Sequence, residues 1–321
     1  MRPFVRPLLA GLLVLSGAGC DESTLRPDPA ADPKDDLVPA RFDRLALAEP
    51  FVIRDIPLDS LWWKWSCCSN TDGFPMDSAG IPYLIVQGKV SYHPSYIIEN
   101  GYAYGSSYEK SGIPIYRTQL KNWVDFLLQR ADTLEYGAIY NPYDFSIALH
   151  NDSSEMLYEG WYSGFTQGMF LALLVRTARI TGEQKYIDAA HRAYRGLTDT
   201  GNEHVSLIDD DGYYWIDDYP GLPLPDLPLN GHLYAMRGLY EYWQWNPTPE
   251  TEYTLRAALT TMKAHAWRYR NPGSASVYCL RHRLVAPHFH DQIIMLLNDA
   301  YRMSGDSAFL DLVADYESDY P

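Results

Sequence analysis

The sequence predicts a mainly α-helical fold, an α/α barrel or incomplete toroid of about four helical hairpins preceded by a short extended or β segment. Apolar residues recur at helical spacing from about residue 92 onward. Short turns join the helices in pairs, and the first helix of each pair is the more apolar, which is typical of inner and outer helices in a ring. The predicted helices cover residues 93–106, 115–131, 162–180, 184–198, 230–245, 250–269, 289–304 and 306–317.

The turns within these pairs resemble one another. They cover residues 110–116, 181–186, 246–253 and 304–309, and each ends with an aromatic residue that opens the second helix. These aromatics, Tyr116, Tyr186, Tyr253 and Phe309, follow one another at intervals of 70, 67 and 56 residues. One hairpin is too small to bury its own apolar face, so the repeat predicts hairpins that stack side by side. Ligands are then expected at the mouth, where the loops between hairpins converge.

The N-terminal segment has the features of an export signal. Arg2 and Arg6 precede an apolar run at 8–15, and small residues lead to Cys20, which is the pattern of a lipid-attachment site. Residues 1–20 are therefore predicted to be a signal peptide, 21–45 a flexible tether, 46–91 an extended segment on the helical body and 92–321 the catalytic domain. We expect an exported bacterial lipoprotein, on the periplasmic or cell-surface side, that contacts the membrane only through this anchor.

The composition excludes some partners. The formal net charge is −15, which argues against nucleic acid. Aromatic residues make up 14% of the chain, with 26 Tyr and 9 Trp, and such side chains either stack on sugars or fill an aromatic core.

One window departs from the acidic character of the chain. Residues 254–290 contain no Asp or Glu and hold ten basic or imidazole side chains. The window is either a local anion site or a segment whose charges pair with acidic residues elsewhere. These side chains are Arg256, Lys263, Arg268, Arg270, Arg281, Arg283, His265, His282, His288 and His290.

Familiar cofactor and metal motifs are absent from the sequence. There is no Walker-type glycine loop, HExxH, GxSxG or CxxC, so neither a cofactor nor a metal site is predicted. Asp209, Asp210, Asp211 and Gly212 form a solvated turn in this interpretation, because they lack the alternation of a calcium loop. The thiol of Cys279 is either unpaired or bonded to one of the adjacent cysteines at 67–68.

Four local groups combine polar and aromatic residues at the predicted mouth. They are 159–168, which opens an apolar helix, the stretch YWIDDYP at 214–220 with the prolines that follow it, 229–240, and 277–282. Taken singly, each group is explained by core packing or helix capping. Their recurrence near the starts of inner helices favours a shared cleft. In it, a proline-stiffened loop would hold a carboxylate and a phenol beside a sugar ring.

The same groups resemble a known family. The segments GWYSGFTQG, RTARITGEQKY, WIDDYPGLPLPDLPLNGHLYAMRGLYEY and SASVYCLRH are similar, in order and spacing, to the C-terminal region of D-glucuronyl C5-epimerases. The resemblance runs from about residue 155 to the C-terminus and implies an isomerase that inverts C5 of D-glucuronate to L-iduronate in a glycosaminoglycan-like polysaccharide. It implies no cofactor and an anionic uronate polymer as partner; a homodimer is compatible with it.

By motif position, the resemblance assigns roles to individual residues. Asp218 stands where the family has its catalytic Glu, Tyr219 and Tyr278 match its active-site tyrosines, and Arg281 matches the arginine that holds the uronate carboxylate. A tyrosine needs nearby cations to transfer protons near neutral pH, and the acid-free basic window is expected to supply them. A further tyrosine of the family is missing after Arg281, and His288 is the predicted second proton carrier in its place. The further predicted substrate-binding residues are His282, Tyr162, Gln167, Asn230 and Trp215.

Two other functions remain open from the sequence. One is a uronate polysaccharide lyase or glycoside hydrolase on the same toroid, because β-elimination begins with the same abstraction of the C5 proton. The other is a lipoprotein that binds glycans without catalysis.

Overall fold

The computed structural model describes residues 45, 51–62, 74–202 and 204–320. The predicted signal peptide, nearly all of the predicted tether, and the cysteines at 67–68 lie outside these residues. Among the described helices, none is long and apolar enough to cross a membrane.

The predicted helical hairpins are present. Eight α-helices form four consecutive antiparallel pairs in the described part of the chain. Their bounds lie within a few residues of those predicted, except that the predicted helix 250–269 ends as a separate 3₁₀ turn at Ala266–Tyr269 and the predicted helix 93–106 continues to residue 111. The helices are α1 (Pro94–Ser111), α2 (Pro114–Arg130), α3 (Gly164–Thr181), α4 (Gln184–Thr198), α5 (Leu229–Trp245), α6 (Pro249–His265), α7 (Pro287–Ser304) and α8 (Ala308–Asp319).

Local sequence explains where these helices turn. The first helices of three pairs end at Gly112, Gly182 and Gly305, whose φ angles of 66°, 68° and 69° lie in the left-handed region that glycine adopts without steric cost. The remaining pair lacks this glycine. There, Thr248 caps α6 by accepting a hydrogen bond from the Thr251 amide, and Thr251 in turn accepts one from the Thr248 amide.

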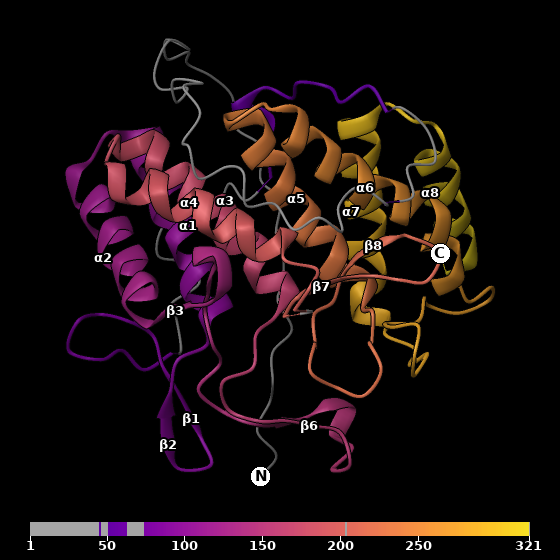
Figure 1. The fold of residues 1–321 in the computed structure, drawn as a ribbon, viewed down its shortest axis with the longest axis horizontal. Coiled ribbons are helices and arrows are strands. Elements are labelled where there is room, and N and C mark those ends of the chain that lie inside the picture. Colours follow the sequence, from indigo (N-terminus) through magenta and orange to yellow (C-terminus); the bar gives the residue numbers. More distant parts are fainter. Residues whose placement is uncertain (1–44, 46–50, 63–73, 203, 321) are drawn as a thin grey trace.

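The first helices of the pairs form an inner row in the order α1, α3, α5, α7, and the second helices pack against them (Figure 1). This arrangement confirms the predicted α/α toroid of about four hairpins. Its centre is the contact between α3 and α5, where small residues bring the two backbones together. A Cβ atom added at Gly168 would lie 2.2 Å from the Cα of Ala235, and one added at Gly238 would lie 2.0 Å from the carbonyl oxygen of Gly168. Only glycine fits at these two positions.

Within the residues that the structure describes, the strands are short and occur as four separate antiparallel pairs. They lie in the N-terminal segment and in the loops between helices, and Figure 1 shows most of them on one side of the helical row. The pairs are β1 (Leu84–Val86) with β2 (Lys89–Ser91), β3 (Asp132–Thr133) with β4 (Ile139–Tyr140), β5 (Ile147–Ala148) with β6 (Met156–Leu157), and β7 (Ser206–Ile208) with β8 (Tyr214–Ile216).

The N-terminal segment at 51–62 lies against the helical body. The Arg54 amide donates to the carbonyl of Met303 in α7. The Tyr240 hydroxyl in α5 accepts from the Ile56 amide and donates to the Arg54 carbonyl, both at 2.7 Å. Residues 51–53, which the sequence predicts to be extended, are not part of a strand in the structure.

Candidate functional site

The stretch YWIDDYP begins as strand β8 and continues into a loop between the N-termini of α3 and α5. The buried His232 of α5 accepts from the Ile216 amide at its Nδ1 atom, which holds the end of the strand. Two glycines, at the starts of α3 and α5, allow the loop to pack closely against both helices. A Cβ atom at Gly164 would lie 2.4 Å from the Asp217 carbonyl oxygen, and one at Gly231 would lie 2.9 Å from the Cβ of Asp218. The two carboxylates therefore sit deeper than a surface loop allows.

Asp218 is buried and shares a hydrogen bond with Ser163, the residue that caps α3. The Ser163 hydroxyl donates to Oδ1 of Asp218 and also accepts from the Thr166 amide. Burial raises the pKa of Asp218 to about 7, and the neighbouring Asp217 adds to this rise, while the Ser163 hydrogen bond opposes it. Burial likewise raises the pKa of Asp217 to about 6. Asp218 can therefore accept or release a proton near neutral pH.

Two of the predicted tyrosines meet beside this carboxylate. The hydroxyl of Tyr219 lies 2.9 Å from the hydroxyl of Tyr278. Burial, and then the charge of Asp218, raise the pKa of Tyr219 well above its ordinary value, and burial together with Tyr219 does the same for Tyr278. The sequence predicted that nearby cations would lower the pKa of these tyrosines. This prediction is wrong, because burial and neighbouring acidic groups raise the pKa of both. Both are neutral hydroxyl donors over the usual pH range.

The basic side chains of the acid-free window are largely neutralised by ion pairs. Most of its cations pair with carboxylates from outside the window, as in the second interpretation of the sequence. Lys263 lies 2.7 Å from Asp306, and Arg270 pairs with Asp315 and Asp319 on α8. The window can lack acidic residues because the carboxylates that pair with its cations are distant in sequence and close in space.

Arg281 and His282 lie on the loop that follows Tyr278, and both contact Glu155. Arg281 pairs with this carboxylate through Nη2 and donates to the carbonyl of Leu224 at 2.9 Å. His282 has its Nε2 atom 2.9 Å from Glu155 and its Nδ1 atom 2.6 Å from Asp226. The loop is thus anchored to two other loops, at 141–163 and 217–228, and the arginine is only partly exposed.

Further polar and aromatic side chains lie near the tyrosine pair, and Asn230 follows Leu229, whose amide donates to the Tyr278 carbonyl. Asn230 is buried, and its Oδ1 atom has no hydrogen-bond partner among the described residues, which favours a role in binding a ligand. Trp161 stacks on Tyr143 with ring centroids 3.9 Å apart, and its ring also lies 6.0 Å from that of Tyr219 and 6.5 Å from that of Phe145. Sequence reasoning missed Tyr143, and it included Ser163 and Trp161 only within the group 159–168, without roles of their own. The Ser163 cap could have been found, because serine directly before an apolar helix is a capping signal.

Three predicted binding residues are engaged elsewhere. Gln167 is 2% exposed, and its amide donates to the carbonyls of Ile139 and Ala193. Trp215 is also 2% exposed, and its indole donates to Asp209. Both therefore stabilise the fold and offer a sugar no surface, contrary to their predicted role. Tyr162 donates to Asp132, and its ring contacts lie with Tyr140 and His204.

His288 and His290 open α7 and differ in burial. His288 is exposed, and its ring contacts Phe289, which in turn lies against Tyr278 with a centroid distance of 5.1 Å. His290 is buried. Its Nδ1 accepts from the Ser276 amide, so its Nε2 carries the proton and donates to the Tyr316 carbonyl. The role of His290 is structural, whereas His288 reaches the tyrosine pair only through Phe289.

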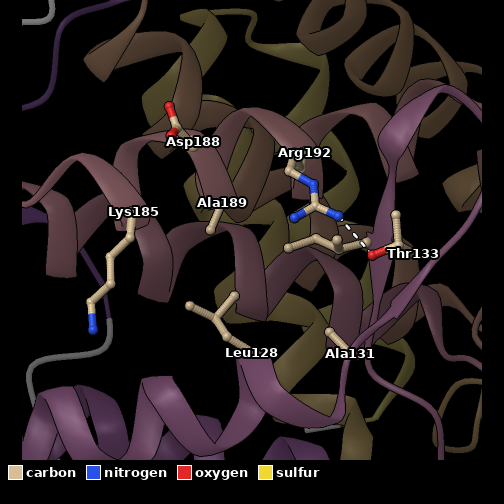
Figure 2. A pocket seen from close by; sticks show the side chains of 8 residues that line it. Leu128, Ala131, Thr133, Lys185, Asp188, Ala189 and Arg192 are labelled. Atoms are coloured by element: carbon tan, nitrogen blue, oxygen red, sulfur yellow. Dashed lines mark hydrogen bonds between the residues drawn. The ribbon is translucent and has the colours of Figure 1, made fainter.

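A pocket on the outer helices has no connection with these residues. Its volume is about 310 Å³, and it lies between α2 and α4. Figure 2 shows Arg192 turned toward Thr133, to which it donates a hydrogen bond of 2.7 Å. The charge of Lys185 is paired with Asp125, so the pocket carries no group poised for chemistry.

Comparison with protein families gives one match over most of the helical body. The family described as D-glucuronyl C5-epimerase C-terminus matches residues 135–318. A D-glucuronyl C5-epimerase of Caenorhabditis elegans is 27% identical over 134 residues, which cover 38% of this chain and 22% of that protein. The match thus spans about a fifth of the relative's length.

Solved structures share the fold at low sequence identity. The cellobiose 2-epimerase of Bacillus thermoamylovorans superimposes with a TM-score of 0.58 at 10% identity, over 77% of this chain and 66% of that one. A sugar epimerase from a ruminal bacterium gives a TM-score of 0.55 at 13% identity over the same shares. At such identities the likeness shows the fold alone, an α/α toroid.

Proposed function

The chain belongs to the D-glucuronyl C5-epimerase family, and from this premise we propose that it inverts C5 of D-glucuronate residues in a glycosaminoglycan-like polysaccharide. The observation that carries the proposal is the buried carboxyl of Asp218 beside the hydroxyl pair of Tyr219 and Tyr278. Inversion at C5 needs a group that removes the proton on one face of the ring and a group that returns one on the other. The site supplies both kinds of group.

Asp218 is the group that we assign as base. Its pKa of about 7 leaves a substantial ionised fraction at neutral pH, and the ionised form is basic enough to take a proton from carbon once the intermediate is stabilised. The C5–H electron pair then passes into the uronate carboxylate, which carries the extra charge. Ser163 keeps the Asp218 carboxylate in one orientation throughout.

The tyrosine pair is the group that we assign as acid. A neutral phenol donates its proton to C5 from the opposite face, and the neighbouring hydroxyl, 2.9 Å away, stabilises the phenolate that is left. The cycle closes when the proton on Asp218 and the charge on the phenolate recombine. The raised pKa values of Tyr219 and Tyr278 suit this donor role, because both tyrosines begin the reaction protonated.

Three further groups complete the proposed site. Arg281 has five N–H donors, and Glu155 and the Leu224 carbonyl engage two of its nitrogens, so we assign the remaining donors to the uronate carboxylate. The unpartnered Oδ1 atom of Asn230 accepts from a sugar hydroxyl. Trp161, stacked on Tyr143, offers an aromatic face to a neighbouring ring.

We extend the proposal to the location of the protein, because the sequence has the features of an export signal. A lipid attached at Cys20 would hold the enzyme at a bacterial membrane, on the periplasmic or cell-surface side, where it would meet polysaccharide during or after its synthesis.

The test is incubation of the enzyme with heparosan-type oligosaccharides in D₂O, followed by NMR of the C5 position. We expect deuterium at C5 and the appearance of iduronate. A product that absorbs in the ultraviolet without iduronate would instead identify a lyase. Binding of the oligosaccharide without any exchange at C5, across several uronate polymers, would identify a glycan-binding protein and refute catalysis.

A further inference from the structure

A second cluster of reactive side chains lies directly beside the proposed site. It consists of His150, Asp226, Cys279 and His282, whose nitrogen, oxygen and sulfur atoms all lie within 4.8 Å of one another. His150 comes from a 3₁₀ turn (Leu149–Asn151), Asp226 from the loop before α5, and the other two from the loop before α7. Three separate loops therefore meet at one point.

The distances within this cluster fit a tetrahedral metal ion. The Sγ atom of Cys279 lies 3.7 Å from Nε2 of His150 and 3.7 Å from Nδ1 of His282, and Nε2 of His150 lies 3.2 Å from Oδ2 of Asp226. Zinc bonds of about 2.0–2.3 Å arranged as a tetrahedron place ligand atoms roughly 3.3–3.6 Å apart. The two separations that involve Asp226 are shorter than this range, slightly so for His150 at 3.2 Å and clearly so for His282 at 2.6 Å, and the latter must widen when an ion enters.

The surroundings of the cluster have the features of a metal site. Asp226 and Cys279 are fully buried, whereas the side chains of His150 and His282 are 15% and 24% exposed, which leaves a path from solvent. Glu155 lies 2.9 Å from Nε2 of His282, on the side away from the cluster. A carboxylate in this position orients metal-binding histidines in many proteins and increases their basicity.

The ligand types select the ion. A thiolate, a carboxylate and two neutral imidazoles carry two negative charges, which a divalent cation neutralises within a buried site. Sulfur and imidazole ligands exclude magnesium and calcium, which prefer oxygen, and four protein ligands with no open position are characteristic of structural zinc.

We propose that His150, Asp226, Cys279 and His282 bind one zinc ion, which joins the three loops of the site. The ion would act on the reaction by position. Tyr278 precedes Cys279 in the chain and has its ring 5.7 Å from that of His150, while Arg281 precedes His282. The two residues assigned to the acid and to the carboxylate clamp would therefore be held by metal ligands on each side.

The first test measures metal content in the purified full chain, by elemental analysis after dialysis and by zinc titration against a chromophoric chelator. We expect one zinc per chain. His150→Ala should weaken zinc binding by more than the roughly 10–100-fold that loss of an outer partner costs, and Glu155→Gln should weaken it within that range. His204→Ala is the matched control, because His204 belongs to a separate cluster with Glu135 and Asp199.

The second test identifies the thiolate by cobalt substitution in a chain whose other cysteines, at 20, 67 and 68, are replaced by serine. We expect the intense near-ultraviolet band of a cobalt–thiolate bond, and its loss in Cys279→Asp, which still binds metal. Circular dichroism checks that the variants keep their helices.

The outcomes separate this proposal from the proposed reaction, because metal binding is measured without substrate. Less than a tenth of a zinc per chain after loading would overturn the zinc site. So would unchanged zinc affinity in folded His150→Ala, or loss of zinc in His204→Ala alone. In each of these cases the four side chains form a network of hydrogen bonds and ion pairs.

Discussion

The Tyr219 and Tyr278 hydroxyls, 59 residues apart in the chain, lie 2.9 Å from each other in the folded protein. Tyr219 follows the Asp217–Asp218 pair at the end of β8, and Tyr278 lies in the middle of the loop before α7. The contact joins two inter-hairpin loops whose helices, α5 and α7, are neighbours in the inner row. It also defines the proton path of the proposed reaction, and the predictions below start from it.

Removal of the Tyr219 or the Tyr278 hydroxyl should impair the return of a proton to C5 of the sugar. Tyr278→Phe and Tyr219→Phe keep the ring but remove the donor, and we expect turnover to fall by about 10²–10⁴-fold for the one that donates directly. The partner should show a smaller loss, since it acts by stabilising the phenolate. Deuterium incorporation at C5 is the measurement, and Tyr158→Phe, at a side chain 72% exposed, is the control. Wild-type rates in both variants would remove the pair from the mechanism.

His288 tests the alternative proton carrier. Because it is exposed and separated from Tyr278 by Phe289, we expect His288→Ala to retain net inversion. If inversion is lost while exchange on one face of the ring persists, the histidine is the carrier.

Arg281 should be sensitive to a change that keeps its charge. Arg281→Lys loses the planar fork that grips a carboxylate in two bonds, so we expect a loss of about 10²–10³-fold in kcat/KM with an intact fold. Arg283→Lys, on the same loop and exposed, is the matched control. Equal kinetics for the two variants would place the uronate carboxylate elsewhere.

The rate should depend on the ionisation of Asp218. The base must be ionised, and its pKa is about 7, so kcat/KM should fall about tenfold per pH unit below that value. Asp218→Asn should abolish exchange at C5 at every pH. A flat profile between pH 5 and 7 would assign the base to another group.

The free energy of unfolding should decrease as pH rises, whereas kcat/KM should increase. The carboxyls of Asp217 and Asp218 have pKa values raised from 3.8 to about 6 and about 7. Above pH 4 the folded chain holds protons that the unfolded chain has released, up to about pH 6 at Asp217 and about pH 7 at Asp218. Within each window the free energy of unfolding falls as pH rises, by about 1 kcal/mol per pH unit for each group. This contribution is fully present below the unfolded pKa and is lost above pH 7.

Urea unfolding at pH 4.5 and pH 8 measures this effect. Asp218→Asn cannot ionise, so it should gain stability over the wild type at pH 8 and little at pH 4.5. Asp210→Asn, in the exposed turn between β7 and β8, should show no such difference. A gain of equal size at both pH values would indicate a cause other than the titration of Asp218.

The helices were predictable because their two signals are local. Apolar residues at a spacing of 3.6 locate each helix, and Gly112, Gly182 and Gly305 mark three of the turns. The strands β3 to β6 escaped prediction because a pair of two residues has no detectable alternation. Asp218, Tyr219 and Tyr278 were predicted as catalytic residues through the resemblance of short motifs to a family, and the structure brings their side chains together. Their catalytic roles stay a prediction.

Other site features depend on contacts that no short segment contains. Trp215 was misjudged because an aromatic residue before two carboxylates has the same appearance in a binding loop and in a buried strand. The cluster of His150, Asp226, Cys279 and His282 joins positions up to 132 residues apart, and only Cys279 and His282 show a chelating spacing. Such a site becomes visible only in three dimensions.

The close contacts of Gly168 with Ala235 and Gly238 limit the substitutions that this chain tolerates. A single added methyl group at either glycine would force α3 and α5 apart, and with them the loops that begin at their N-termini. Variation that alters specificity must therefore accumulate in the loops at 141–163, 217–228 and 277–286, while the helix pair below stays constant. Laboratory evolution toward another uronate polymer should accordingly recover substitutions in these loops and almost none at the two glycines.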